Sequence, residues 1–185
     1  MSTIPKAPCL SPLQQKQPGS APDQADKELI KAQQLEYDRI YKETDELYHD
    51  FAKSCGLSDS AFWILYALQE AHRPYSQTDL YRLWFFSKQT VHSTLKQLQA
   101  WDLICLCPAP DNKKNKLVLL RPKGRALIQQ TVLPLMEAEQ AAFARLSEEE
   151  RQALLDLTRK HLFLLRKETE AFIKTKHPQK EGNPL

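Results

Sequence analysis

The residues best suited to chemistry lie between positions 86 and 125. This segment holds eight lysine and arginine side chains against two acidic ones, whereas the rest of the chain is mildly acidic. Three lysines, Lys113, Lys114 and Lys116, fall within four positions of a polar turn. Such a concentration of positive charge on an acidic body is the distribution expected for a polyanion partner.

A helix that can carry base-reading chemistry precedes these lysines. Ser87 is a good N-cap, and the pattern that follows predicts a helix to about Trp101. Val91, Leu95 and Leu98 would share its buried face. The side chains available for DNA on the rest of the helix are Lys88, Gln89, Thr90, His92, Ser93 and Lys96. The alternative is an ordinary solvated helix face.

Each of these polar groups suits a particular part of a DNA base edge. The Gln89 amide can form two hydrogen bonds with adenine, and Lys88 can reach the acceptors of guanine. The Thr90 methyl group can contact the methyl group of thymine. The first turn of the helix also presents free N–H groups and a positive dipole to phosphate.

The neighbouring elements must hold this helix in place. Ser76 should cap a short helix before it, which predicts a helix-turn-helix. After it, the apolar runs 103–107 and 117–120 predict two strands of a hairpin with the lysines at its tip. An ordinary soluble turn is the alternative interpretation of the lysines.

Long helices flank this central unit. Apolar spacing predicts one helix over 23–54, followed by Gly56, and a second helix that begins at Ser58. Pro122 should open a helix that Pro134 kinks. The Ser147–Glu150 capping box should start the last helix.

The two ends of the chain have a different character. Residues 1–22 contain five prolines and predict a disordered tail, and residues 177–185 should fray. The sequence contains neither a secretory signal nor a stretch of about 20 apolar residues, so we expect a cytoplasmic protein with no membrane partner.

Three segments carry a family resemblance: SQTDLYRLW, SKQTVHSTLKQLQAWDLI and DNKKNKLVLLRPKGRALI. Over residues 26–175 the chain resembles the MarR family of winged helix-turn-helix regulators. The resemblance implies a mainly α fold with a small β-hairpin wing. Within a MarR-like domain of residues 23–176, the winged helix-turn-helix would span 58–121, and the dimerisation helices 23–56 and 122–176.

The resemblance also implies a function. The chain would be a homodimeric transcriptional regulator, most simply a repressor, that reads a pseudo-palindromic operator in double-stranded DNA. The wing has Asn112-Lys113-Lys114 where the family often has Asp-Arg-Arg, so we expect it to hold phosphate more than to read groove shape. The family's DNA contacts carry over to Ser76, Gln77, Ser87, Lys88, Gln89, Thr90, His92, Ser93, Lys96, Asn112, Lys113, Lys114 and Lys116.

Several aromatic and cysteine residues could either form a functional site or simply pack in the core. Many regulators of this family respond to small aromatic effectors, and Tyr41, Tyr48, Trp63 and Tyr66 could line an effector pocket or belong to the core. Cys9 or Cys55 could sense peroxide, whereas Cys105 and Cys107 should face one side of a strand.

We predict no metal site, no cofactor and no enzyme activity, because no catalytic or metal-binding motif is present. Two other functions stay open. The chain could be a helical dimer that binds a protein partner, or a metabolite sensor without sequence-specific DNA recognition.

Overall fold

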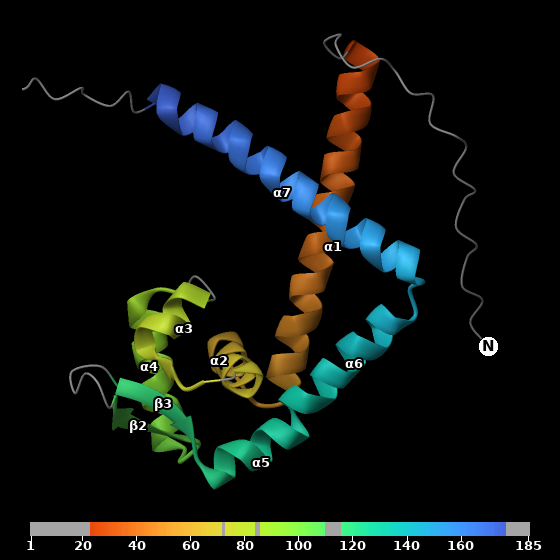
Figure 1. Cartoon of the computed structure of the whole chain (residues 1–185). Coiled ribbons are helices and arrows are strands. Elements are labelled where there is room, and N and C mark those ends of the chain that lie inside the picture. Colours follow the sequence, from red (N-terminus) through yellow and green to blue (C-terminus); the bar gives the residue numbers. More distant parts are fainter. Residues whose placement is uncertain (1–22, 72, 84–85, 110–115, 177–185) are drawn as a thin grey trace, which may run out of the picture. The chain divides into compact units, whose positions relative to one another are not determined.

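The computed structural model describes residues 23–71, 73–83, 86–109 and 116–176 (Figure 1). They divide into two compact units, with the boundary in the chain between Phe51 and Ala52. Most of helix α1 (Gln24–Ser54) makes up the described part of the first unit, which confirms the long helix predicted over 23–54. The predicted tail and the C-terminal residues 177–185 lie outside the described residues.

Gly56 ends α1, as the sequence predicts. Its φ of +71° lies in the left-handed region, which glycine adopts at little cost. The Gly56 N–H donates to the Lys53 carbonyl at 2.9 Å, and the Leu57 N–H donates to the Ala52 carbonyl at 3.0 Å. This pair of hydrogen bonds is a Schellman motif, which satisfies two carbonyl groups of the last turn.

Helix α2 (Asp59–Glu70) forms the centre of the second unit. Its predicted cap is confirmed, because the Ser58 hydroxyl accepts a hydrogen bond from the Ala61 N–H at 3.3 Å. Phe62, Ile64 and Leu65 are fully buried. Helices α3 (Gln77–Leu83) and α4 (Lys88–Ala100) pack with α2 beside the strands (Figure 1).

The second unit also contains a small antiparallel sheet. Strands β2 (Ile104–Pro108) and β3 (Lys116–Leu120) form the predicted hairpin, with Ile104 paired to Leu120. A two-residue strand β1 (Tyr75–Ser76) pairs with the other edge of β3, giving the order β1-β3-β2. This third strand was not predicted, because two residues are too few to show an alternating pattern.

Proline breaks the helix that was predicted to be kinked. The structure has α5 (Pro122–Gln130) and α6 (Val132–Ala144), separated by Thr131 with φ −125° and ψ −69°. Pro134 has no N–H for the Gln130 carbonyl, and its ring would collide with that carbonyl in a continuous helix. The prediction of one continuous, kinked helix is therefore wrong, because the segment forms two separate helices.

Helix α7 (Glu148–Lys176) begins at the predicted capping box. The Ser147 N–H donates to the Glu150 carboxylate at 2.8 Å, and the Glu150 N–H donates to the Ser147 hydroxyl at 3.2 Å. Among the helices of the described ranges, none combines the length and the apolar character needed to cross a membrane.

The core of the second unit joins its helices to its sheet. The fully buried side chains include Leu80 of α3, Leu95 and Leu98 of α4, Val118 of β3 and Ile128 of α5. Because α4 contributes several of them, its orientation is fixed by the core of the whole unit.

Candidate nucleic-acid interface

Helix α4 has one buried face and one exposed face, as predicted. Val91, Leu95 and Leu98 are each at most 1% exposed, and Thr94 is also buried. Half-buried Thr90 lies at the margin. The face away from the core exposes Lys88, Gln89, His92, Ser93 and Lys96. The helix therefore offers donors, acceptors and charge to solvent from an anchored backbone.

The predicted cap at Ser87 is confirmed. Its hydroxyl accepts a hydrogen bond from the Thr90 N–H at 3.0 Å and lies 2.8 Å from the Thr90 hydroxyl. Ser87 itself is exposed. One of the otherwise unsatisfied N–H groups of the first turn is thus bound within the protein, and the helix dipole still presents positive charge at this end.

Tyr81 of α3 contacts Lys88 of α4, which was not predicted from the sequence. The Lys88 ammonium lies 5.5 Å from the centre of the Tyr81 ring, within cation–π range. Tyr81 is half-buried. Only the packing of α3 on α4 brings the two residues together, and local spacing carries no signal for it.

A hydrogen bond between hydroxyls lies on the inner side of α4. The Ser60 hydroxyl on α2 and the Thr94 hydroxyl on α4 are 2.9 Å apart. Thr94 is only 4% exposed, so the partner satisfies a polar group that would otherwise be costly to bury. This contact links α4 to α2 beside the apolar core.

The start of α3 differs from the expectation for Ser76. This residue was predicted to contact DNA, but it is 4% exposed. Its hydroxyl donates to the Asp79 carboxylate at 2.8 Å and accepts from the Asp79 N–H at 3.2 Å. The side chain is therefore engaged as a helix cap, and Gln77 beside it is half-buried.

Asp79, which forms this cap with Ser76, also forms an ion pair with Arg73. Its carboxylate also accepts two hydrogen bonds of 3.3 Å from the Arg73 guanidinium. Burial acts to raise the pKa of Asp79, but the hydrogen bonds from Arg73 and Ser76 outweigh it, so the pKa lies below its usual value. Asp79 therefore accepts the hydrogen bonds at the start of α3 in its ionised, carboxylate form.

The wing is described along its two strands, and residues 110–115 between them lie outside the described residues. Lys116, at the start of β3, is exposed and pairs with Pro108 of β2. The predicted contacts at Asn112, Lys113 and Lys114 lie outside the described residues.

The predicted effector residues divide between the two units. Tyr41 and Tyr48 belong to the first unit. Trp63 and Tyr66 belong to the second, where their ring centres lie 5.3 Å apart. The Tyr66 hydroxyl donates to Glu139 of α6 at 2.8 Å, so this tyrosine connects α2 to α6.

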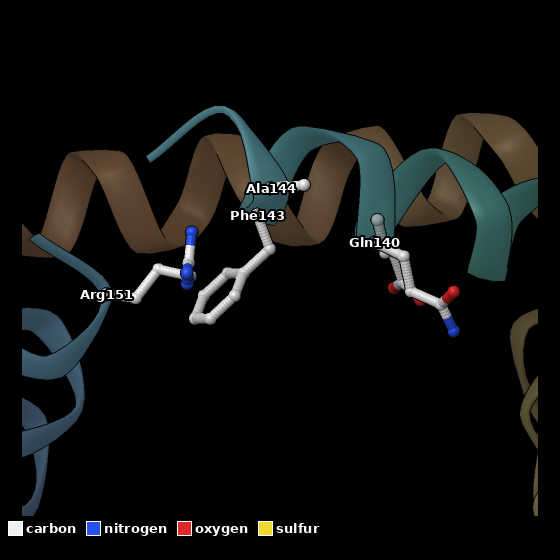
Figure 2. A pocket seen from close by; sticks show the side chains of 5 residues that line it. Gln140, Phe143, Ala144 and Arg151 are labelled. Atoms are coloured by element: carbon white, nitrogen blue, oxygen red, sulfur yellow. The ribbon is translucent and has the colours of Figure 1, made fainter. Parts of the chain in front are cut away.

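A cavity of about 640 Å³ opens beside Glu139. Its lining also includes Phe143 of α6 and Arg151 of α7, whose side chains point toward each other in Figure 2. The Arg151 guanidinium donates to the Leu146 carbonyl as well. An aromatic ring next to a guanidinium is chemistry that suits a small aromatic acid.

The cysteines provide no closed metal site in the part of the chain that is described. No group of three or more histidine, cysteine, aspartate or glutamate side chains gathers there. Cys55 is half-buried, and Cys9 lies outside the described residues. The sulfur contact with Cys105, together with burial, raises the pKa of the Cys107 thiol.

The fold and the exposed helix define a winged helix-turn-helix protein: α3 and α4 form the helix-turn-helix, and β2 and β3 form the wing. The model of the MarR family matches residues 56–114, which cover α2, α3, α4 and the first wing strand. These residues therefore resemble the MarR family, and the comparisons support a winged helix regulator of that family.

Individual relatives agree with this assignment. The chain is 26% identical over 122 residues to the HTH-type transcriptional repressor NicR of Pseudomonas putida, a match that covers 66% of this chain and 77% of NicR.

Two solved structures have a similar fold. Bordetella bronchiseptica BpsR, whose DNA binding is regulated by 6-hydroxynicotinic acid, is 26% identical with a TM-score of 0.54, over 68% of this chain and 89% of BpsR. Staphylococcus aureus MarR, solved with salicylate and kanamycin, is 23% identical with a TM-score of 0.59, over 76% of this chain and 94% of that chain.

Proposed function

We propose that this protein is a transcriptional repressor that binds a pseudo-palindromic operator as a homodimer. The observation that carries the proposal is the division of α4 into a buried face and an exposed polar face, with Gln89 in its first turn. A helix of this kind can enter the major groove while its apolar face stays in the protein core.

In this proposal, different exposed residues of α4 contact the bases and the phosphates of the DNA. Gln89 would form two hydrogen bonds with an adenine, and Lys88 would reach a guanine or a phosphate. His92, Ser93 and Lys96 extend the same exposed face. Lys113, Lys114 and Lys116 of the wing would hold phosphates, which gives affinity without sequence preference.

The buried cap at Ser76 changes one part of the expected interface. Because the Ser76 hydroxyl is committed to Asp79, we leave this side chain out of the DNA contacts. Gln77 stays in the proposal as a phosphate contact near the start of α3, where helix N–H groups favour anions.

The homodimer is supported by exposed apolar side chains on α1 and on α7. On α1, Ile40, Tyr41 and Leu47 are each more than half exposed, and on α7 Leu157, Phe163 and Phe172 are exposed by 62–66%. Apolar area of this extent on long helices favours a partner helix. A two-fold dimer would present two α4 helices to the two halves of an operator.

A small aromatic carboxylate is the proposed effector class. BpsR responds to 6-hydroxynicotinic acid, and the cavity beside Glu139 offers Phe143 to a ring and Arg151 to a carboxylate. Trp63 and Tyr66 stay candidates because Tyr66 contacts Glu139. A ligand here would act on α2, which packs directly against α4.

Selection of bound duplexes from a random pool tests the proposal. Repeated rounds should enrich a two-fold symmetric motif, and 6-hydroxynicotinate or salicylate should lower the retained fraction. Enrichment of no motif at low salt would contradict DNA reading. Enrichment that neither acid affects would contradict the effector class and leave DNA reading intact.

A further inference from the structure

Two thiols face each other on β2, the first wing strand. The Sγ atoms of Cys105 and Cys107 are 3.9 Å apart, and both residues are half-buried. In the register of the sheet, Cys105 lies opposite Leu119 and Cys107 lies opposite Leu117. Directly paired residues point to the same side of a sheet, so the thiols and these two leucines share one face.

The separation of the thiols suits a metal ion without rearrangement. At a metal–sulfur distance of about 2.3 Å, two sulfur atoms 3.9 Å apart subtend about 116° at the ion, close to a tetrahedral angle. A disulfide would instead require the sulfur atoms to approach to about 2.05 Å. Chelation therefore needs no movement of the two sulfur atoms, whereas a disulfide needs them to move closer.

Solvent can reach this pair. Cys105 borders an open cavity of about 370 Å³, whose lining also includes Leu119, Arg73 and Arg125. The two leucines opposite the thiols are half-buried and give the site an apolar side. Thiolate sulfur in such surroundings selects soft ions over hard ions such as Mg²⁺.

We propose that Cys105 and Cys107 form a two-thiolate site for a soft, thiophilic divalent metal ion of the zinc and cadmium group. One ion displaces the two thiol protons and forms two metal–sulfur bonds, so the bound unit is neutral and two protons leave to solvent. Water or a small solute completes the coordination. Because the protein supplies two donors from the described residues, the ion should exchange more readily than in a four-cysteine site.

Cadmium titration of the full chain tests the site. A Cys9→Ser, Cys55→Ser variant keeps only the proposed pair of thiols. It should show thiolate-to-cadmium absorption in the ultraviolet that saturates at one Cd²⁺ per chain. Adding Cys105→Ser or Cys107→Ser should weaken Cd²⁺ binding more than about 10-fold, since each removes a ligand. Equal affinity with and without these changes would overturn the proposal.

A second measurement uses the unaltered protein, so it does not depend on how well a variant folds. Iodoacetamide labelling followed by mass spectrometry reports each thiol separately. Cd²⁺ should protect Cys105 and Cys107 together and leave the labelling of Cys55 unchanged. Protection of only one of the pair, or equal protection of Cys55, would show that the two thiols do not form a common site.

Discussion

Gly124, in the first turn of α5, lies directly against the main chain of Leu103. A Cβ atom at Gly124 would stand 2.1 Å from the Leu103 carbonyl oxygen and 3.0 Å from its carbonyl carbon. The same oxygen accepts a hydrogen bond from the Arg121 N–H at 2.9 Å. This contact joins the start of α5 to the segment between α4 and β2, so it helps to set where the wing leaves the exposed helix.

Gly124→Ala should therefore destabilise the protein. The added methyl group meets backbone atoms that cannot move aside cheaply, and overpacking of this kind costs about 1–3 kcal/mol. Urea unfolding followed by circular dichroism measures the change.

Gly56→Ala is the matched control for this substitution. An added Cβ at Gly56 meets nothing within 4 Å, and its cost of about 1–2 kcal/mol comes only from the positive φ. An unfolding midpoint for Gly124→Ala equal to that of the unaltered protein would refute the close contact.

Ser60 and Thr94 should show energetic coupling across the α2–α4 contact. Thr94→Val removes the hydroxyl and should cost about 0.5–1.5 kcal/mol, since it breaks a partly buried hydrogen bond. In a double-mutant cycle with Ser60→Ala, the second change should cost less once the first is made. Strict additivity of the two free energies of unfolding would argue against the hydrogen bond in solution.

Asp79 should contribute stability that is lost in acid. Its pKa is lowered in the folded state, so the contribution is complete above the unfolded pKa of about 3.9 and falls as pH drops through the folded pKa. Asp79→Asn should therefore be less stable than the unaltered protein at neutral pH, and the two should converge once the pH falls below the folded pKa of Asp79. Thermal unfolding from neutral to acid pH measures this difference, and a constant difference at every pH would contradict the assignment.

Tyr81 should position Lys88 for the proposed DNA contact. Tyr81→Leu removes the aromatic face and should weaken duplex binding by about 2- to 5-fold, the range expected for an exposed cation–π contact. Tyr81→Phe keeps the ring and should bind nearly as tightly as the unaltered protein. Fluorescence anisotropy with a selected duplex separates the variants, and equal losses in both would assign the effect to the hydroxyl instead.

The helix starts could be predicted because their signals are local. Ser58, Ser76, Ser87 and Ser147 each satisfy a nearby N–H of the following turn, and the structure confirms all four caps. The buried face of α4 could also be predicted, because helical spacing places Val91, Leu95 and Leu98 on one side.

The missed features depend on how separate elements pack together. Strand β1 exists only because Tyr75 and Ser76 lie beside β3. The cation–π pair of Tyr81 and Lys88 needs the packing of α3 on α4. Burial of Ser76 likewise depends on its place in β1 beside β3, although its hydroxyl bonds to the nearby Asp79.

Gln89 and Gln99 allow the most direct test of the central claim, that the start of α4 reads DNA. Both glutamines are exposed on the same helix, one in its first turn and one in its last. Binding of each alanine variant is measured by anisotropy on the selected operator and on duplexes with single base-pair changes. Gln89→Ala should lose about 1–3 kcal/mol of discrimination at one base pair in each half-site, and Gln99→Ala should keep full discrimination. Unchanged discrimination in Gln89→Ala, or an equal loss in both variants, would contradict the account.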